Sequence, residues 1–438
     1  MKRTALFFAV LCASLLVLSA GCKKKEAVQA GPAAEGGYIR FAWWGNTTRD
    51  ERTIKAAQLF MEKNPGVTVE TEPTQWDNYW AKLATQAAAG SLPDIMQQDY
   101  QYIVQYNDRN QLVDMNTYAQ QGVIDLSKWS DSGLSSGRLN GKLIALSLGT
   151  NAWGMGVDPE ILKQAGVTID DTKWTWKDFE QIAITVFQKT GIQTMTTAPD
   201  AYHMTYENIG RQFSAPFFSP DHKSLGFSNH AAAKAAIKEN IDMWLRLKAA
   251  GALYDPDDAF ITGRSMEEEP VSRGKTWNGM YWSNQHVGHV AAAKRPLDYL
   301  ICPSVNGPKA PFGTYLKPSQ FISMLSSSKS QDLAAKFVNF FVNDLEANRI
   351  LLAERGIPAP TSVREDLAPL VDPGMKYLFD YITKVTPYTT AIDPPDAPQA
   401  GEVRDVMRPI LLRCLKGELS SQAALDQMIQ AANAVLSR

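Results

Sequence analysis

The sequence predicts an α/β protein built from two lobes. Its 438 residues, 45% of them apolar, suffice for two medium-sized domains with buried cores. Between residues 38 and 100, short apolar runs alternate with segments of helical periodicity, and this alternation predicts a parallel sheet covered by helices. In open sheets of this kind, a ligand binds beyond the carboxyl ends of the strands.

The individual elements follow from residue spacing. The helix predicted at 48–63 carries Ile54, Ala57 and Met61 on one face and ends before Asn64-Pro65-Gly66. Apolar or alternating runs predict strands at 39–43, 67–70 and 92–96 and a second helix at 77–89. After residue 148 the chain becomes rich in helices. The clearest predicted elements there are helices 178–189, 231–250 and 421–436, a pair of helices over 331–354 and a strand near 299–302.

The first 22 residues have the pattern of an export signal. Lys2 and Arg3 precede an apolar run from Ala5 to Leu18 that is too short to span a bilayer, and small residues then lead to Cys22. This end resembles the lipobox of bacterial lipoproteins, in which the cysteine is acylated and becomes the new N-terminus, although Ser19 stands where Leu is usual. We therefore expect a signal peptide at 1–21, lipidation at Cys22 and a solvated tether at 22–37, with acyl chains as the only membrane contact.

Charge and cysteine content narrow the class of protein. Lys and Arg total 44 against 46 Asp and Glu, so a nucleic-acid partner is not expected. Cys302 and Cys414 are the only cysteines of the mature body, and their pairing as a disulfide and their presence as two buried thiols both stay open.

The sequence carries weak signals for enzymatic chemistry. His286 and His289 have the spacing of a helical metal pair, but no nearby Cys or acidic residue completes a ligand set, so we interpret them as structural. Residues 267–269 are three consecutive Glu, which is typical of a solvated surface. No nucleophile elbow or phosphate loop is present. We expect no catalytic residues, metal or cofactor.

A set of short motifs, in order over nearly the whole mature chain, resembles bacterial extracellular solute-binding protein family 1, the maltose-binding-protein-like proteins of ABC sugar importers. The motifs are Ile39–Gly45 (IRFAWWG), Asn64–Val69 (NPGVTV), Leu92–Ile95 (LPDI), Gln111–Tyr118 (QLVDMNTY), Asn140–Ala145 (NGKLIA), Trp174–Phe179 (WTWKDF), Trp282–Asn284 (WSN), Phe337–Phe340 (FVNF) and Gly356–Ala359 (GIPA). The resemblance is nearest to members that import plant-derived or other oligosaccharides.

The resemblance implies a type II periplasmic-binding-protein fold, in which two lobes, each a mostly parallel sheet flanked by helices, are joined by a hinge of three crossings. Carried onto this chain, the crossings fall near 148–151, 301–304 and 356–357. The implied lobes are 38–147 plus 304–355 and 148–303 plus 356–438. It further implies a monomer, anchored on the extracytoplasmic side of a membrane, that delivers a sugar to ABC permease subunits.

Candidate sugar contacts combine aromatic rings, which pack on the C–H faces of a sugar, with side chains that bond its hydroxyl groups. Trp43 and Trp44 point to opposite faces of a strand, and we expect Trp44 to face the ligand and Trp43 the core. Asp99 follows the third strand and is interpreted as a hydroxyl acceptor or, alternatively, a helix N-cap. The other candidates are Arg49, Gln75, Trp76, Tyr100, Asn151, Trp153, Trp282, Asn284 and Tyr315.

Two other functions remain open at this stage. A solute such as glycerol phosphate or a polyamine would need a cluster of charged groups in the cleft in place of paired aromatic rings. A secreted glycosidase or lyase would need paired carboxylates, which meet only in space and leave no spacing signal in the sequence.

Overall fold

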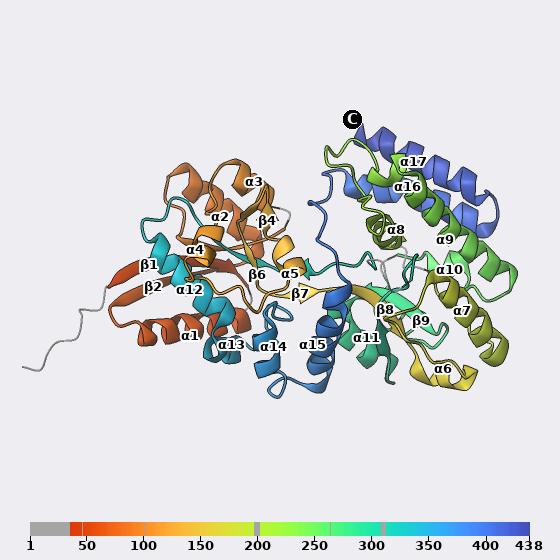
Figure 1. Ribbon diagram of the computed structural model, residues 1–438, viewed down its shortest axis with the longest axis horizontal. Coiled ribbons are helices and arrows are strands. Elements are labelled where there is room, and N and C mark those ends of the chain that lie inside the picture. The colour runs from red at the N-terminus through yellow and green to blue at the C-terminus, as the bar shows by residue number, and fades with distance from the viewer. Residues whose placement is uncertain (1–35, 46, 101, 197–201, 263, 308–311) are drawn as a thin grey trace, which may run out of the picture. The chain divides into compact units, whose positions relative to one another are not determined.

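A computed structural model of the chain describes residues 36–45, 47–100, 102–196, 202–262, 264–307 and 312–438 (Figure 1). Gly36–Arg438 forms one compact unit. The predicted signal peptide at 1–21, Cys22 and nearly all of the predicted tether at 22–37 lie outside the described residues, so they stay predictions. None of the described helices combines the length and the apolar character that a bilayer crossing requires.

The first sheet contains the three predicted strands: those at 39–43 and 67–70 are longer than predicted, and the one predicted at 92–96 lies at 95–98. Its order is β2-β1-β3-β12-β6, with β2 (Val67–Thr74), β1 (Gly37–Trp44), β3 (Ile95–Gln98), β12 (Phe321–Met324) and β6 (Leu146–Ser147). β1 runs parallel to β2, from Gly37 opposite Val67 to Trp44 opposite Thr74, and parallel to β3. β12 runs antiparallel to both β3 and β6, so the sheet is mixed with a parallel part, as its helical crossovers require.

The alternation along β1 divides its side chains between two cores. Ile39, Phe41 and Trp43 pack in one hydrophobic cluster and Ala42 and Trp44 in another, which confirms that the two tryptophans point to opposite faces. The helices of this part of the chain are α1 (Thr47–Lys63), α2 (Trp76–Ala88), α3 (Ile103–Asp108), α4 (Asn116–Gln120), α5 (Asp131–Ser135), α12 (Gln331–Asn343) and α13 (Leu345–Leu351).

The second sheet differs from the prediction. β10 (Asp298–Leu300), β8 (Trp153–Val157) and β9 (Asn278–Trp282) lie in that order, and both of their pairings are antiparallel, so the expectation of a mostly parallel sheet is wrong for these strands. The local apolar pattern reveals that a strand exists, whereas its direction depends on where the intervening helices return the chain. Gly156 allows β8 and β9 to pack closely, because a Cβ there would lie 1.9 Å from the Tyr281 hydroxyl.

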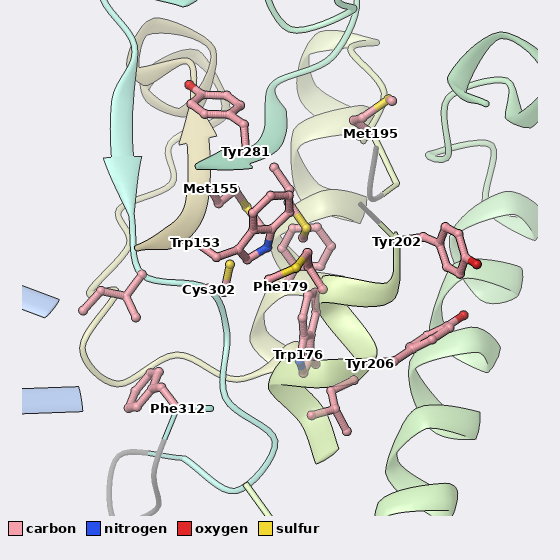
Figure 2. Packing of buried hydrophobic residues seen from close by; sticks show 14 of the residues in the cluster. Trp153, Met155, Trp176, Phe179, Met195, Tyr202, Tyr206, Tyr281, Cys302 and Phe312 are labelled. Carbon is pink, nitrogen blue, oxygen red and sulfur yellow. The ribbon is translucent and has the colours of Figure 1, made fainter. Parts of the chain in front are cut away.

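A large core, which includes Trp153, Phe179, Tyr206 and Cys302, surrounds the second sheet (Figure 2). Cys302 and Cys414 are buried free thiols. Three predicted helices are confirmed: 178–189 within α7 (Trp176–Thr190), 231–250 as α9 (Ala231–Ala249) and 421–436 as α17 (Ser421–Leu436). The helices of this part are α6 (Pro159–Ala165), α7 (Trp176–Thr190), α8 (Tyr202–Arg211), α9 (Ala231–Ala249), α10 (Pro256–Ala259), α11 (His286–Ala293), α14 (Thr361–Leu367), α15 (Pro373–Val385), α16 (Ala400–Lys416) and α17 (Ser421–Leu436), with 3-10 turns η1 (Gly226–Asn229), η2 (Ser283–Gln285) and η3 (Thr386–Tyr388).

Three distant segments lie side by side between the two sheets in the fold. β7 (Thr150–Asn151) pairs with β11 (Lys317–Pro318), and the Thr150 amide donates to the Ile357 carbonyl at 2.8 Å. Gly149 makes this approach possible, since a Cβ there would lie 2.5 Å from the Arg355 carbonyl oxygen. A separate hairpin joins β4 (Arg138–Leu139) and β5 (Lys142–Leu143).

Candidate functional site

An aromatic cluster occupies the carboxyl ends of β1 and β2. It consists of Trp44, Trp76, Tyr79, Trp80 and Tyr102. The Trp44 ring meets Trp76 and Tyr79 edge to face, with ring centroids 5.0 and 5.2 Å apart, and Trp80 stacks on Tyr102 at 3.9 Å. Trp44 is 8% exposed and Trp76 is 39% exposed. Trp76 is therefore the member of the aromatic cluster with the most open surface, and Trp44 supports it from behind.

A cavity of about 860 Å³ lies next to the end of β3. The first sheet contributes Asp99 and Tyr100, which follow β3, and Phe321 at the start of β12. The other described residues that line the cavity lie in α8, at the end of β9, in segments 315–320 and 392–398, and in α16. The cavity is thus built by segments that are far apart in the sequence.

Four of the predicted site residues line this cavity: Asp99, Tyr100, Trp282 and Tyr315. The backbone carbonyl of Asp99 accepts hydrogen bonds from the amides of Tyr102 and Ile103. Tyr102 is the N-cap residue of α3, and the interpretation of the Asp99 side chain as a hydroxyl acceptor or a helix cap stays open. The predicted residues outside the described lining of the cavity are Trp44, Arg49, Gln75, Trp76, Asn151, Trp153 and Asn284.

Among the predicted residues that do not line the cavity, Arg49 forms an ion pair, whereas Gln75 and Asn284 are exposed. The Arg49 guanidinium lies 2.8 Å from a carboxylate oxygen of Glu354 and donates to the Trp44 carbonyl at 3.1 Å. Gln75 is exposed as the N-cap residue of α2, and Asn284 is exposed in η2.

Asn151 and Trp153 lie close to Trp282, on neighbouring strands. Trp153 is only 2% exposed, and its ring meets the Trp282 ring edge to face at 5.5 Å. Asn151 accepts a hydrogen bond from the Ser283 hydroxyl at 3.4 Å and stands opposite Lys317 in the β7–β11 pair. Both residues therefore position the Trp282 wall of the cavity from behind.

The Trp282 ring is the main aromatic surface of the cavity. Its backbone amide donates to the Gln285 side chain at 2.9 Å, which fixes the turn that follows β9. Tyr315 meets the ring edge to face at 5.8 Å, and the Lys317 ammonium lies 4.7 Å from the ring centroid. The ring thus stands between a buried phenol and a cation.

The cavity also contains charged and polar residues that sequence reasoning did not identify. His203 and Glu207 come from α8, Lys317 from β11, Asp396 from the segment before α16, and Arg404 from α16. All members of α8 from Tyr202 to Arg211 are buried, so it has no solvent face that would have set its polar residues apart as site residues. Lys317 lies two residues after the predicted Tyr315, but a lone Lys carries no spacing signal.

Burial shifts the ionisation of several of these groups. Burial raises the pKa of Glu207 to about 8, against a smaller lowering by Arg211, so its protonated form is favoured at neutral pH. Burial lowers the pKa of His203 to about 3 and keeps the imidazole neutral. The surrounding protein partly desolvates the Lys317 ammonium and so lowers its pKa, while Asp396, Glu207 and Asp99 oppose this shift. The polar lining therefore contains both hydrogen-bond donors and acceptors.

One edge of the cavity is formed by residues 389–398, which we call the strap. The Tyr100 hydroxyl donates to the Asp393 carbonyl, and the Ile392 amide donates to the Ser135 hydroxyl at 3.2 Å. From α8, Arg211 forms an ion pair with the Asp393 carboxylate at 2.7 Å. The strap is therefore held both by residues next to the first sheet and by α8.

No group of described residues brings together three His, Cys, Asp or Glu side chains that could hold a metal ion. His286 and His289 lie in a buried aromatic stack instead. The ring of His289 stacks on Tyr281 at 3.9 Å, and the His286 Nδ1 lies 3.2 Å from the Tyr281 hydroxyl. Burial lowers the pKa of both imidazoles to about 4.

The fold and the sequence place the chain in a known family. Residues 55–376 match the family described as bacterial extracellular solute-binding protein, so the chain belongs to this family. An extracellular solute-binding protein family 1 structure from Alicyclobacillus acidocaldarius is 26% identical with a TM-score of 0.83, covering 93% of this chain and 100% of that one. The predicted family and fold class are thereby confirmed.

Two further relatives are more distant. A periplasmic oligogalacturonide binding protein from Yersinia enterocolitica has the same fold, with 20% identity, a TM-score of 0.74 and coverage of 92% of this chain and 99% of that one. A putative ABC transporter periplasmic-binding protein of Escherichia coli is 27% identical over 105 residues. That match spans 23% of this chain and 22% of the relative.

Proposed function

We propose that this chain is the substrate-binding component of an ABC importer, that it captures an oligosaccharide in the cavity, and that it delivers the sugar to membrane permeases. The observation that carries this proposal is the pairing, in one cavity, of the Trp282 ring with the polar groups of Asp99 and Glu207. Aromatic faces and precisely placed hydrogen-bond partners are what a sugar site needs. The volume of about 860 Å³ lies in the range of roughly 300–1,000 Å³ that is common for ligand pockets.

Within this site, Trp282 provides the stacking surface, Tyr315 and Trp153 hold its ring in place, and Asp99 accepts sugar hydroxyl groups. Tyr100 holds the strap over the ligand. Trp76 and the aromatic cluster offer a second apolar surface to a longer oligosaccharide, with Trp44 in support, and Arg49, Gln75, Asn151 and Asn284 contribute from the margins. The positions of Trp44, Asp99 and Trp282, at the end of a strand or directly after one, support these roles.

We further propose that the protein binds its ligand by closing two lobes about a hinge. Two of the predicted crossings, 148–151 and 356–357, lie next to each other, because the Thr150 amide donates to the Ile357 carbonyl, and this contact supports the proposal. Residues 317–319 are a better candidate for the third than 301–304, because the Ser319 amide donates to the Gly149 carbonyl at 2.8 Å. By contrast, the Ser304 amide donates to the carbonyl of Trp174, a residue of the core around the second sheet. The mature chain would be a monomer, anchored through Cys22 on the extracytoplasmic side of a membrane.

Thermal shift against a panel of oligosaccharides, followed by calorimetry on the hits, tests this proposal. A ligand at 100 times its dissociation constant that binds only the folded protein should stabilise it by about 2.7 kcal/mol. Recovery of the intact glycan after incubation is expected. Turnover of the glycan would instead favour a glycosidase or lyase, and stabilisation only by glycerol phosphate or a polyamine would favour a different solute.

A further inference from the structure

The cavity contains a cation that the fold itself leaves without an ionic partner. Among the described residues, Lys317 forms no ion pair, and its ammonium group faces the Trp282 ring at 4.7 Å. Its side chain is exposed in a wall of the cavity, and its backbone is held by the β7–β11 pair. The charge is therefore presented to the cavity from a fixed strand.

The other ionisable groups that line the cavity differ from Lys317 in their ion pairing or their protonation. Arg404 is paired with Asp396, and a guanidinium bound to a carboxylate has less to offer a ligand. Burial favours the protonated form of Glu207, and His203 is neutral because burial opposes its charge. Asp99 lines the cavity directly after β3 and, like Asp396 and Glu207, acts electrostatically on Lys317. Lys317 is thus suited to an anionic group of a ligand, and Asp99 is suited to hydroxyl groups.

We propose that Lys317 is a specificity-determining residue that selects an acidic oligosaccharide, one whose sugar rings carry carboxylates, over neutral ones. This inference rests on the proposed function and narrows its substrate class. In the bound state a uronate ring would pack on Trp282 while its carboxylate replaces the aromatic ring as the partner of the ammonium. A charge-assisted hydrogen bond of this kind is stronger than the contact of a cation with an aromatic face.

The arrangement also explains why one lysine can discriminate. A neutral sugar would have to leave the ammonium over the ring or push it into solvent, and it would gain no charged partner in return. A carboxylated sugar would pair with the Lys317 ammonium and would at the same time leave the face of the Trp282 ring available to the sugar ring. Because the surrounding protein partly desolvates the ammonium, the pair would be screened by salt less than a fully solvated surface pair.

The test compares an oligogalacturonate of four residues with its methyl ester, because esterification removes the charge and keeps the ring. Calorimetry on the full mature protein should give at least tenfold tighter binding of the acid. Lys317→Met should abolish this preference, while Lys317→Arg should keep it. Lys336→Met removes the same charge from an exposed site on α12 and should leave the preference unchanged.

The possible outcomes separate this inference from the proposed function. If the protein binds neutral oligosaccharides and does not prefer the acid, or if Lys317→Met retains the preference, the selectivity assigned to Lys317 is wrong and sugar binding stands. If no oligosaccharide of either kind binds, both proposals fail. The melting temperature of each ligand-free variant is expected to match the native value, because Lys317 is exposed.

Discussion

Replacement of Arg211 by Met should loosen the strap and destabilise the protein. The Arg211 side chain is only 3% exposed. Besides its ion pair with Asp393 at 2.7 Å, it donates to the Gly313 carbonyl at 2.9 Å and to the Thr390 hydroxyl at 2.6 Å. Its guanidinium also lies 4.6 Å from the centroid of the Tyr315 ring. Methionine would fill much of the volume but would leave these acceptors without a donor.

The size of the effect follows from burial. Removal of one partner of a fully buried ion pair costs about 3–5 kcal/mol. Because the Asp393 side chain is 29% exposed, water can solvate part of the abandoned charge, and we expect a loss of about 3 kcal/mol. Burial is also the largest influence on the pKa of Asp393, which it raises, so a carboxylate that lacks Arg211 would take up a proton more readily.

Urea denaturation followed by tryptophan fluorescence would measure this loss, and a cycle with Asp393→Asn would isolate the Arg211–Asp393 coupling. Arg349→Met is the matched control, because Arg349 is half exposed in its ion pair with Asp366 and its removal should change stability far less. A loss for Arg211→Met no larger than that of the control would refute the view that Arg211 fastens the strap. Weaker oligosaccharide binding is expected in the same variant.

Three further predictions concern the cavity wall, the histidines and the anchor. Trp282→Ala should weaken oligosaccharide binding at least tenfold in calorimetry with little loss of stability, whereas Trp153→Ala should cost about 3–5 kcal/mol of unfolding free energy; the reverse pattern would exchange their roles. The pKa of His289 is about 4 in the fold against 6.5 in the unfolded chain. Its contribution to stability is therefore complete above pH 6.5 and falls on acidification, by about 2 kcal/mol at pH 5, so the loss of stability between pH 7 and pH 5 should be about 2 kcal/mol smaller in His289→Gln than in the native protein. Cys22→Ala should release the protein from the membrane fraction, and a variant that stays there would contradict lipidation.

Residue periodicity predicted the elements of the first sheet well because their burial is local. Ile39, Phe41 and Trp43 alternate with polar or oppositely facing residues, and this alternation records which face of the strand meets a core. Helix α1 starts after Gly45 and ends at Lys63, and neighbouring residues likewise determine both of these positions. The direction of β9 beside β8 was not predictable in this way, because it depends on the path of the long helical segment between them.

The candidate site was predictable only where a strand end identifies a position. Asp99 and Trp282 directly follow or end a strand, and both line the cavity. Glu207 lies in the middle of a buried helix, and Asp396 lies in an irregular segment almost 300 residues after Asp99, so no local rule connects them. The charges of the cavity meet through tertiary folding alone, and their effect on one another could be assessed only in the structure.

Two basic residues beside the Trp282–Tyr315 pair have opposite dispositions, and the difference bears on function. Arg211 is buried. It donates hydrogen bonds to the Gly313 carbonyl and the Thr390 hydroxyl and forms an ion pair with Asp393, so its charge stabilises the wall of the cavity. Lys317 faces the Trp282 ring of the same aromatic pair, with its ammonium 4.7 Å from the ring centroid. A guanidinium has the rigid set of donors that suits it to a fixed structural network, whereas an ammonium on a flexible stem can turn toward an incoming carboxylate. The buried structural position is thus occupied by an arginine, and the position that we propose contacts the ligand is occupied by a lysine.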